Sequence, residues 1–188
     1  LSRTLMPVGD YEKDEIREIA KKFNIRVANK PDSQEICFVT DNDYASFVEN
    51  ERGEKMPEGN FVTADGEVLG RHKGILHYTI GQRKGLGIAL GHPIFVTEIR
   101  SETNEIVIGE SEDVFGLSLE ADNLNAMAVE DFTDGMRAVG KIRYSHGGEN
   151  CTVKVLDKDR IRIDFDKRVR AITPGQAVVL YDDRGLVL

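Results

Sequence analysis

The spacing of apolar residues near the start of the chain predicts a helix over residues 10–24. Apolar side chains recur there at intervals of three and four residues, which places them on one face of a helix. They are Ile16, Ile19, Ala20 and Phe23. Asp10 can cap the first turn, and Asn24 can adopt the left-handed conformation that ends a helix. Because one helix cannot bury its own apolar stripe, we expect a covering surface in a domain that precedes Leu1.

After residue 40 the pattern changes to short apolar segments separated by turns. Asp41 can cap a second short helix. Segments 61–63 and 67–69 flank an Asp-Gly turn, and segments 94–100 and 105–109 flank another polar turn. Both pairs are typical of β-hairpins.

Strict alternation of apolar and polar residues returns in the last third of the chain. The inward faces of two successive strands are expected to carry Cys151, Val153 and Val155, and then Ile161, Ile163 and Phe165. Strands are predicted over residues 136–144, 151–157, 160–166 and 176–181. They suggest a small antiparallel barrel. The stretch 115–134 before them is acidic and rich in turn residues, and we place a domain boundary near 115–120.

The fold class predicted from these patterns is mainly β with a short N-terminal α segment. Its expected parts are the tail of an N-terminal domain over 1–40, a small central β-rich domain over 41–115 and a C-terminal antiparallel β-barrel over 116–188. Since the chain starts without Met and ends in an apolar segment, we expect a piece of a longer protein. Small barrels often bind RNA, but fold alone does not establish function.

The composition adds limits on compartment and partners. The chain has 188 residues, a formal net charge of -8 and two cysteines, Cys37 and Cys151. No apolar run approaches the roughly 20 residues that span a bilayer, so no membrane partner is expected. Two cysteines do not make a disulfide framework, and a reducing cytoplasm is the default compartment. We expect a cytoplasmic monomer.

The charges are distributed unevenly along the chain. Residues 98–134 contain eleven acids and one base, whereas residues 67–92 contain four bases and one acid. Residues 137–180 contain ten bases and five acids, so two basic stretches flank an acidic one. A basic surface can bind phosphate groups even when the whole chain is acidic, although ordinary solvated surfaces have the same composition.

One cysteine lies where a polar sequence changes to an apolar one, in the segment 30–39, which reads Lys-Pro-Asp-Ser-Gln-Glu-Ile-Cys-Phe-Val. Asp32 and Ser33 can cap a short helical turn after Pro31. Free backbone N–H groups at the start of such a turn lower the pKa of a nearby thiol, which makes Cys37 a candidate reactive residue. The alternative is that Cys37 is a small buried residue among its apolar neighbours.

Residues 70–92 contain six glycines and three histidines. The glycine spacing matches neither nucleotide-binding fingerprint, and no strand–helix–strand context is expected around it. Zinc would need three or four ligands in a closed geometry, which Cys37 with His72, His77 and His92 can in principle supply. Because the sequence lacks a compact ligand pair, no metal site is predicted.

Several long motifs carry a resemblance to a known family. The segment 30–39, Gly-Arg-His-Lys-Gly over 70–74 and Tyr-Thr-Ile-Gly-Gln-Arg-Lys-Gly-Leu-Gly-Ile over 78–88 closely resemble the tRNA-specific 2-thiouridylases. Lys-Ile-Arg-Tyr over 141–144 and Ala-Ile-Thr-Pro-Gly-Gln over 171–176 follow in the same order as in that family. The resemblance covers essentially the whole chain.

The resemblance implies sulfur transfer to C2 of the wobble uridine of tRNA. In that family ATP adenylates the C2 oxygen, and a cysteine persulfide then delivers sulfur. Cys37 would carry the persulfide, would be loaded by a sulfur-carrier protein and would later form a transient disulfide with a first catalytic cysteine. The ATP loop, its Mg²⁺ and that first cysteine belong to an N-terminal domain outside this sequence, so no cofactor is expected in this part.

The resemblance also implies that Arg143, Tyr144 and Gln176 contact tRNA. An arginine can bind phosphate through two N–H groups, and a tyrosine can stack on a base. The structural alternatives are a surface salt bridge for Arg143, core packing for Tyr144 and a turn-capping amide for Gln176. The family often has Gln two residues after the tyrosine, whereas this chain has His146, which leaves any contact at that position in doubt.

Two other functions remain as competing hypotheses. A stand-alone RNA-binding module without chemistry would have no need of the thiol of Cys37. A metal- or redox-sensing domain would use Cys37, Cys151 and the histidines, and a metal assay on protein purified without chelator would detect it.

Overall fold

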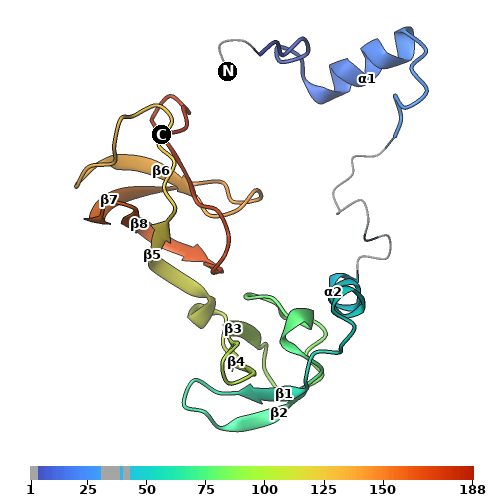
Figure 1. Ribbon diagram of the computed structural model, residues 1–188, viewed down its shortest axis with the longest axis vertical. Coiled ribbons are helices and arrows are strands. Elements are labelled where there is room, and N and C mark those ends of the chain that lie inside the picture. Colours follow the sequence, from blue (N-terminus) through green and yellow to red (C-terminus); the bar gives the residue numbers. More distant parts are fainter. Residues whose placement is uncertain (1–3, 31–38, 40–42) are drawn as a thin grey trace. The chain divides into compact units, whose positions relative to one another are not determined.

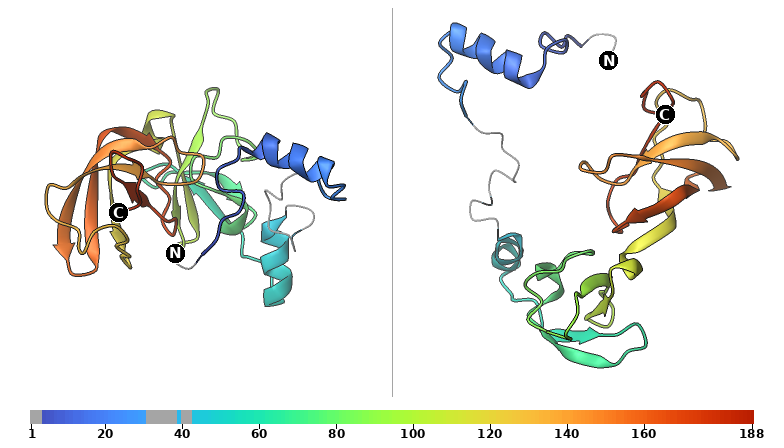
Figure 2. Two further views of the ribbon diagram at one scale, coloured as in Figure 1. Left: turned by 90° about the horizontal axis from the view of Figure 1, so that it is seen from above. Right: turned by 180° about the vertical axis from the view of Figure 1, so that it is seen from behind.

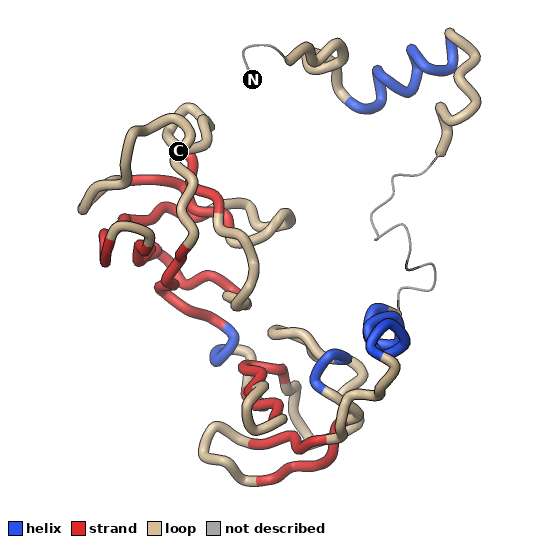
Figure 3. Tube along the Cα trace, viewed as in Figure 1, coloured by secondary structure: helices blue, strands red, loops and turns tan. Residues whose placement is uncertain are grey.

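The computed structural model describes residues 4–30, residue 39 and residues 43–188 (Figure 1). The chain forms two compact units, Leu1–Asp43 and Tyr44–Leu188. Strands make up most of the regular structure in the second unit, and helices are few and short in both (Figure 3). The predicted fold class, mainly β with a short N-terminal α segment, is confirmed.

The first unit contains helix α1 (Lys13–Lys22), which is shorter at both ends than the predicted helix. Its N-cap is Glu12, not Asp10, and the Glu12 N–H donates to the Glu15 carboxylate at 2.8 Å as part of a capping box. Asn24 has a φ of 54°, as predicted for the helix exit. No residue of α1 is buried, so its apolar stripe lacks a covering surface in the described residues.

The second unit begins with helix α2 (Tyr44–Arg52), followed by a four-stranded sheet. Its strands are β1 (Gly59–Val62), β2 (Val68–His72), β3 (Phe95–Arg100) and β4 (Glu105–Gly109), in the order β2-β1-β4-β3. Both predicted hairpins form, and the two are joined by parallel pairing of β1 with β4, which the pattern did not indicate. The short 3₁₀ helix η1 (Ile75–His77) and a long glycine-rich segment connect β2 to β3.

Five antiparallel strands follow, and they lie side by side in Figure 2. The 3₁₀ helix η2 (Glu112–Val114) leads into β5 (Phe115–Asp122), β6 (Arg137–Lys141), β7 (Glu149–Asp157), β8 (Arg160–Arg170) and β9 (Val179–Tyr181). Their order is β5-β8-β7-β6-β9, and no ladder joins β9 to β5, so the described strands form an open sheet. The chain is therefore mainly β as predicted, but the barrel is not closed by hydrogen bonds.

Strand β5 lies in the stretch that was interpreted as turn-rich, and the sequence pattern missed it. It pairs with β8 from Phe115 opposite Arg170 to Asp122 opposite Arg160. Being at the sheet edge, β5 has no fully buried residue, and its apolar positions are half-buried or exposed. An edge strand of this kind shows little of the alternation by which buried strands are recognised.

The core of the five-stranded sheet follows the predicted alternation except at one position. Cys151, Val153, Ile161, Ile163 and Phe165 are all buried. Val155 is 38% exposed, although it lies two residues beyond Val153 on the same face. It borders an open groove beside Leu124 and Phe132, and that groove leaves it uncovered. None of the helices in the described ranges combines the length and the apolar character needed to cross a bilayer.

Candidate nucleic-acid interface

The turn after β6 presents Arg143 and Tyr144 in opposite ways. The Arg143 guanidinium is half-buried and donates from Nη1 to the carbonyl oxygens of Arg170 at 2.8 Å and Ala171 at 3.3 Å. The backbone N–H of His146 donates to the Arg143 carbonyl at 3.1 Å and closes the turn. Tyr144 projects into solvent with a relative exposure of 104%. Core packing of Tyr144, one of the structural alternatives, is therefore wrong.

This geometry leaves the aromatic ring of Tyr144 open for stacking on a base. Arg143 has an anchoring role, since backbone carbonyls take up one end of its guanidinium fork, and no carboxylate pairs with it in the described residues. An arginine has five N–H donors, so the remaining ones can still bind a phosphate. The side chain both fixes the turn and carries a charge beside the exposed ring.

Gln176 lies on an exposed turn after β8, where its N–H donates to the Thr173 carbonyl at 3.3 Å. The turn lines a groove of about 1240 Å³ between the two open edges of the five-stranded sheet. The Thr173 hydroxyl donates to the Ala171 carbonyl, which also accepts from Arg143. The structure thus ties both turns, with Tyr144 on one and Gln176 on the other, to Ala171.

Only one of the two cysteines, Cys151, is among the residues that the structure describes. Cys37 lies outside the described residues. Cys151 is a free, fully buried thiol whose Sγ donates to the Ala138 carbonyl at 3.4 Å. Burial raises the pKa of Cys151 to about 11, so little thiolate forms at neutral pH. The prediction of a core cysteine at position 151 is confirmed, and a redox role for that thiol is disfavoured.

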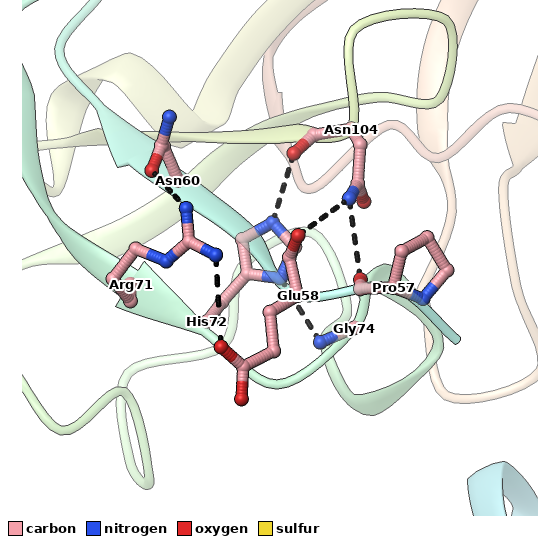
Figure 4. Close-up of polar contacts among 7 residues, drawn as sticks. All are labelled: Pro57, Glu58, Asn60, Arg71, His72, Gly74 and Asn104. Atoms are coloured by element: carbon pink, nitrogen blue, oxygen red, sulfur yellow. Dashed lines mark hydrogen bonds and ion pairs between the residues drawn. The ribbon is translucent and has the colours of Figure 1, made fainter. Parts of the chain in front are cut away.

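Among the histidines, His72 has both ring nitrogens engaged (Figure 4). Its Nδ1 accepts the Gly74 N–H at 3.1 Å, so Nε2 carries the proton and donates to the Asn104 carbonyl at 3.1 Å. The side chain is 2% exposed and makes edge-to-face contacts with the rings of Phe61 and Tyr78, which also contact each other. Burial lowers the pKa of His72, against an opposing contribution from the Asn104 hydrogen bond. This histidine links two turns and has no lone pair left for a metal.

The other histidines do not assemble with His72. The Nε2 of His77 lies 3.7 Å from the Glu49 carboxylate of α2, and His92 is exposed. Across the described ranges, no group of three or more His, Cys, Asp and Glu side chains is arranged to hold a metal ion. His146 differs again, because its buried Nδ1 has no hydrogen-bond partner, and burial together with nearby Arg143 lowers its pKa.

The basic stretch 137–180 is largely neutralised where it forms strands. Carboxylates pair with bases of β6, β7 and β8 in six places: Arg137 with Asp166, Lys154 with Asp164, Arg162 with Asp164, Arg160 with Glu120 and with Asp157, and Arg168 with Glu112. The bases in these pairs are about half exposed to solvent, whereas Asp164 is only 27% exposed. The excess of bases in the sequence is therefore neutralised at these five residues, whereas Lys141 and Lys167 of the same strands have no carboxylate partner among the described residues.

Sequence reasoning assigned no role to Arg170, which the structure places between the two sheets. Its Nη2 donates to the Gly81 carbonyl at 3.1 Å, and its guanidinium lies 5.6 Å from the centre of the Phe95 ring. Its own carbonyl accepts from Arg143. An arginine at the end of a strand carries no local signal for such contacts, because the partners are far away in sequence.

The glycine-rich segment after η1 does not have the form of a nucleotide-binding loop. It runs into strand β3, and no helix N-terminus follows it to receive a phosphate group. This segment therefore does not fit ATP, and no step through ATP is assigned to it.

Comparisons with known proteins cover nearly the whole chain. One family model, described as the tRNA methyl transferase HUP domain, matches residues 1–41. The tRNA methyl transferase PRC-barrel domain matches residues 45–110, and the aminomethyltransferase beta-barrel domain matches residues 117–187. The last match supports a C-terminal domain of the barrel type, although the described sheet is open.

The curated relatives of this chain have names more specific than the descriptions of the family models. The chain is 61% identical over 181 residues to the tRNA-specific 2-thiouridylase MnmA of Lachnoclostridium phytofermentans, covering 96% of this chain and 51% of the relative. It is 51% identical to the protein of the same name in Clostridioides difficile, covering 97% and 50%. It is 49% identical to the protein of that name in Carboxydothermus hydrogenoformans, covering 96% of this chain and 50% of the relative. The chain spans about half the length of these relatives, and it belongs to the tRNA-specific 2-thiouridylase family.

Proposed function

We propose that this chain forms the tRNA-holding and sulfur-delivering half of an enzyme that 2-thiolates the wobble uridine of tRNA. The structural observation that carries the proposal is Tyr144, a fully exposed aromatic side chain on a turn that Arg143 fixes to the backbone. An exposed tyrosine gains nothing for folding, but it offers a stacking platform for an unpaired base. Homologues named as 2-thiouridylases supply the substrate class.

Within this proposal, Arg143, Tyr144 and Gln176 contact the tRNA. Arg143 binds a phosphate with the N–H groups that are not used on Arg170 and Ala171. Gln176 is exposed on its turn and can reach a base or sugar edge, while its side chain has no partner among the described residues. The common attachment to Ala171 supports a joint role for the two turns.

Cys37 is proposed as the cysteine that carries sulfur. The terminal sulfur of a persulfide can attack C2 of a uridine whose C2 oxygen is adenylated, and the C2–O bond breaks as AMP leaves. A second thiol then attacks the sulfur that remains on the cysteine, and a disulfide forms as the S–S bond to the 2-thiouridine breaks. We assign that second thiol and the ATP and Mg²⁺ site to a domain outside this sequence. A separate sulfur-carrier protein would load Cys37. Cys151 is unsuited to either thiol role, because it is buried and its pKa is raised to about 11.

We also propose the division of labour along the chain that the sequence predicted. Residues 1–40 complete a catalytic domain, residues 41–115 form a central domain, and residues 116–188 form the barrel-type domain that holds tRNA. The uncovered apolar stripe of α1 supports the first assignment, because such a stripe needs an apolar surface to cover it.

The test is a chimaera in which this chain replaces the corresponding half of the 61% identical relative from Lachnoclostridium phytofermentans. The chimaera is expected to form 2-thiouridine on unmodified tRNA with ATP and a sulfur donor. Its Cys37→Ser variant should abolish thiouridine formation, because a hydroxyl cannot store sulfane sulfur, while tRNA affinity and ATP-to-AMP turnover persist. Cys151→Ser serves as the matched control and should still thiolate.

Two results would contradict the proposal. Thiouridine formation by Cys37→Ser at a rate near that of the parent chimaera would make Cys37 structural. A chimaera that binds tRNA but forms no thiouridine, under conditions where the relative does, would favour the alternative of an RNA-binding module without chemistry.

A further inference from the structure

The turn Thr79–Lys84 in the central domain carries two basic side chains that lack the carboxylate partners found on the strands. Arg83 and Lys84 are both exposed, and neither pairs with a carboxylate in the part of the chain that the structure describes. Lys154 of β7 and Arg162 of β8 instead share the carboxylate of Asp164, at 2.9 Å and 2.7 Å. The turn therefore presents positive charge that the protein itself does not neutralise.

The backbone of this turn is held by hydrogen bonds at both ends. The Gln82 side chain accepts from the Thr79 N–H at 3.0 Å and donates to the Lys84 carbonyl at 2.9 Å. Gly81 and Gln82 also exchange backbone hydrogen bonds with Val96, at 2.7 and 2.9 Å. Two residues after Lys84, the side chain of Leu86 is buried in the core of the four-stranded sheet. The two bases thus stand on a braced turn, which reduces the ordering cost of binding.

Gly81 brings this turn against the end of β8. It has a φ of 85°, and a Cβ at this position would lie 3.0 Å from the Ala171 Cβ and 3.2 Å from Arg170 Nη1. Arg170 donates to the Gly81 carbonyl, and Arg143 donates to the carbonyls of Arg170 and Ala171. The two-residue segment Arg170–Ala171 therefore contacts both the Thr79–Lys84 turn and the Arg143–Tyr144 turn.

We propose that the Thr79–Lys84 turn is a second phosphate-binding element, with Arg83 and Lys84 contacting the sugar–phosphate backbone of the same tRNA that Tyr144 engages. The inference rests on the proposed tRNA function and extends it to the central domain. Arg170 is a positioning residue in this arrangement, because it ties the turn to the segment that Arg143 holds. The contacts are to phosphates, so they add affinity and orientation without reading sequence.

The experiment measures tRNA binding by the full 188-residue chain as a function of salt. The probe is an unmodified tRNA transcript with uridine at the wobble position. In the double variant Arg83→Gln/Lys84→Gln, affinity at low salt should fall at least about tenfold, and the slope of log K against log salt should become shallower by about two, since each phosphate contact contributes about 0.9. The melting temperature should stay at the wild-type value, because both side chains are exposed.

The matched control is Lys154→Gln/Arg162→Gln, which removes the same charge from the strand surface where Asp164 already neutralises it. This control should keep the wild-type slope. Equal losses in both double variants would show an effect of net charge and overturn the proposal, as would an unchanged slope in Arg83→Gln/Lys84→Gln.

A third variant, Tyr144→Ala, separates this proposal from the one on which it rests. If Tyr144→Ala weakens binding while Arg83→Gln/Lys84→Gln does not, the second element is refuted and the proposed function stands. If the wild-type chain shows no salt-dependent tRNA binding, both are overturned.

Discussion

In the second unit, most reactive and charged side chains on the strands have partners within the protein, whereas those on two turns are exposed. On β6, β7 and β8, five bases pair with carboxylates, and the thiol of Cys151 is buried among apolar side chains; the five are Arg137, Lys154, Arg160, Arg162 and Arg168. On the turns that follow β6 and η1, Tyr144, Arg83 and Lys84 are exposed, and no carboxylate pairs with the two bases in the described residues. These strand side chains are thus paired or buried within the protein, whereas the turn side chains are free to contact a ligand.

The contrast separates stability from binding. Substitutions in the strands and their core should change the free energy of unfolding and leave tRNA affinity unchanged. Substitutions at exposed turn positions should do the reverse. One residue belongs to both groups, since Arg143 anchors its turn to the Arg170 and Ala171 carbonyls and also carries charge beside Tyr144.

Arg143→Ala is expected to have the largest combined effect on stability and tRNA binding. The loss of hydrogen bonds from a charged donor costs about 1.5–3 kcal/mol of stability, and the loss of a nucleic-acid contact costs about 1–3 kcal/mol of binding. Denaturant unfolding and tRNA titration measure the two separately. Arg143→Lys keeps the charge but is shorter and lacks the planar guanidinium whose Nη1 donates to both carbonyls, so it should recover more affinity than stability. Unchanged tRNA affinity in a folded Arg143→Ala protein would leave Arg143 as a purely structural anchor.

Cys151→Ser should lower stability by about 1–3 kcal/mol, because it places a hydroxyl where a fully buried thiol stood. The affinity for tRNA should not change. Stability should also fall above about pH 9, because the unfolded thiol ionises there while the pKa of the buried thiol is about 11. A loss of tRNA binding in a folded Cys151→Ser protein would contradict the assignment of this residue to the core.

The sequence predicted those elements whose partners are local or whose faces are strictly alternating. Both hairpins and the buried positions Cys151, Ile161 and Ile163 were predicted correctly on these grounds. Strand β5 was missed because an edge strand is only half-buried, and Val155 was wrongly placed in the core because an open groove adjoins it. Burial depends on what lies above a residue, which a period of two does not reveal.

For the candidate site, the sequence indicated which residues to consider but not how they are held. The motifs singled out Arg143, Tyr144 and Gln176, whereas the bond from Arg143 to Ala171, which brings the two turns to one residue, spans 28 residues. The contact from Arg170 to Gly81 spans 89 residues and has no local signal. Long-range hydrogen bonds of this kind follow from the fold and cannot be inferred from spacing.

Mild acid should destabilise the second unit through His72. Burial holds the pKa of His72 below its ordinary value near 6.5, so the unfolded histidine binds a proton first as pH falls. Stability should be full above about pH 6.5 and decrease as pH falls through the lowered pKa. In His72→Gln, that part of the pH dependence should be absent when unfolding is followed from pH 7.5 to 5.5. An identical pH profile in the two proteins would show that His72 does not titrate in this range.

Substitution of a paired strand base should have the smallest effect. Arg160→Gln removes the partner of Glu120 and Asp157, and exposed ion pairs of this kind contribute little to stability. The melting temperature should stay within about 2 °C of wild type and tRNA affinity should be unchanged. A clear loss of affinity would mean that the strand surface, despite its carboxylates, also contacts RNA.

The central claim is that the exposed turn, and not the strand surface, binds tRNA, and Tyr144 tests it most directly. The measurement is a tRNA titration of Tyr144→Ala and Tyr144→Phe, with thermal unfolding of both. We predict that Tyr144→Ala weakens binding about tenfold to a hundredfold, as expected for the loss of one stacked base, while Tyr144→Phe binds nearly as well as wild type. Neither melting temperature should change, because the side chain is fully exposed. Wild-type affinity in Tyr144→Ala would contradict the account.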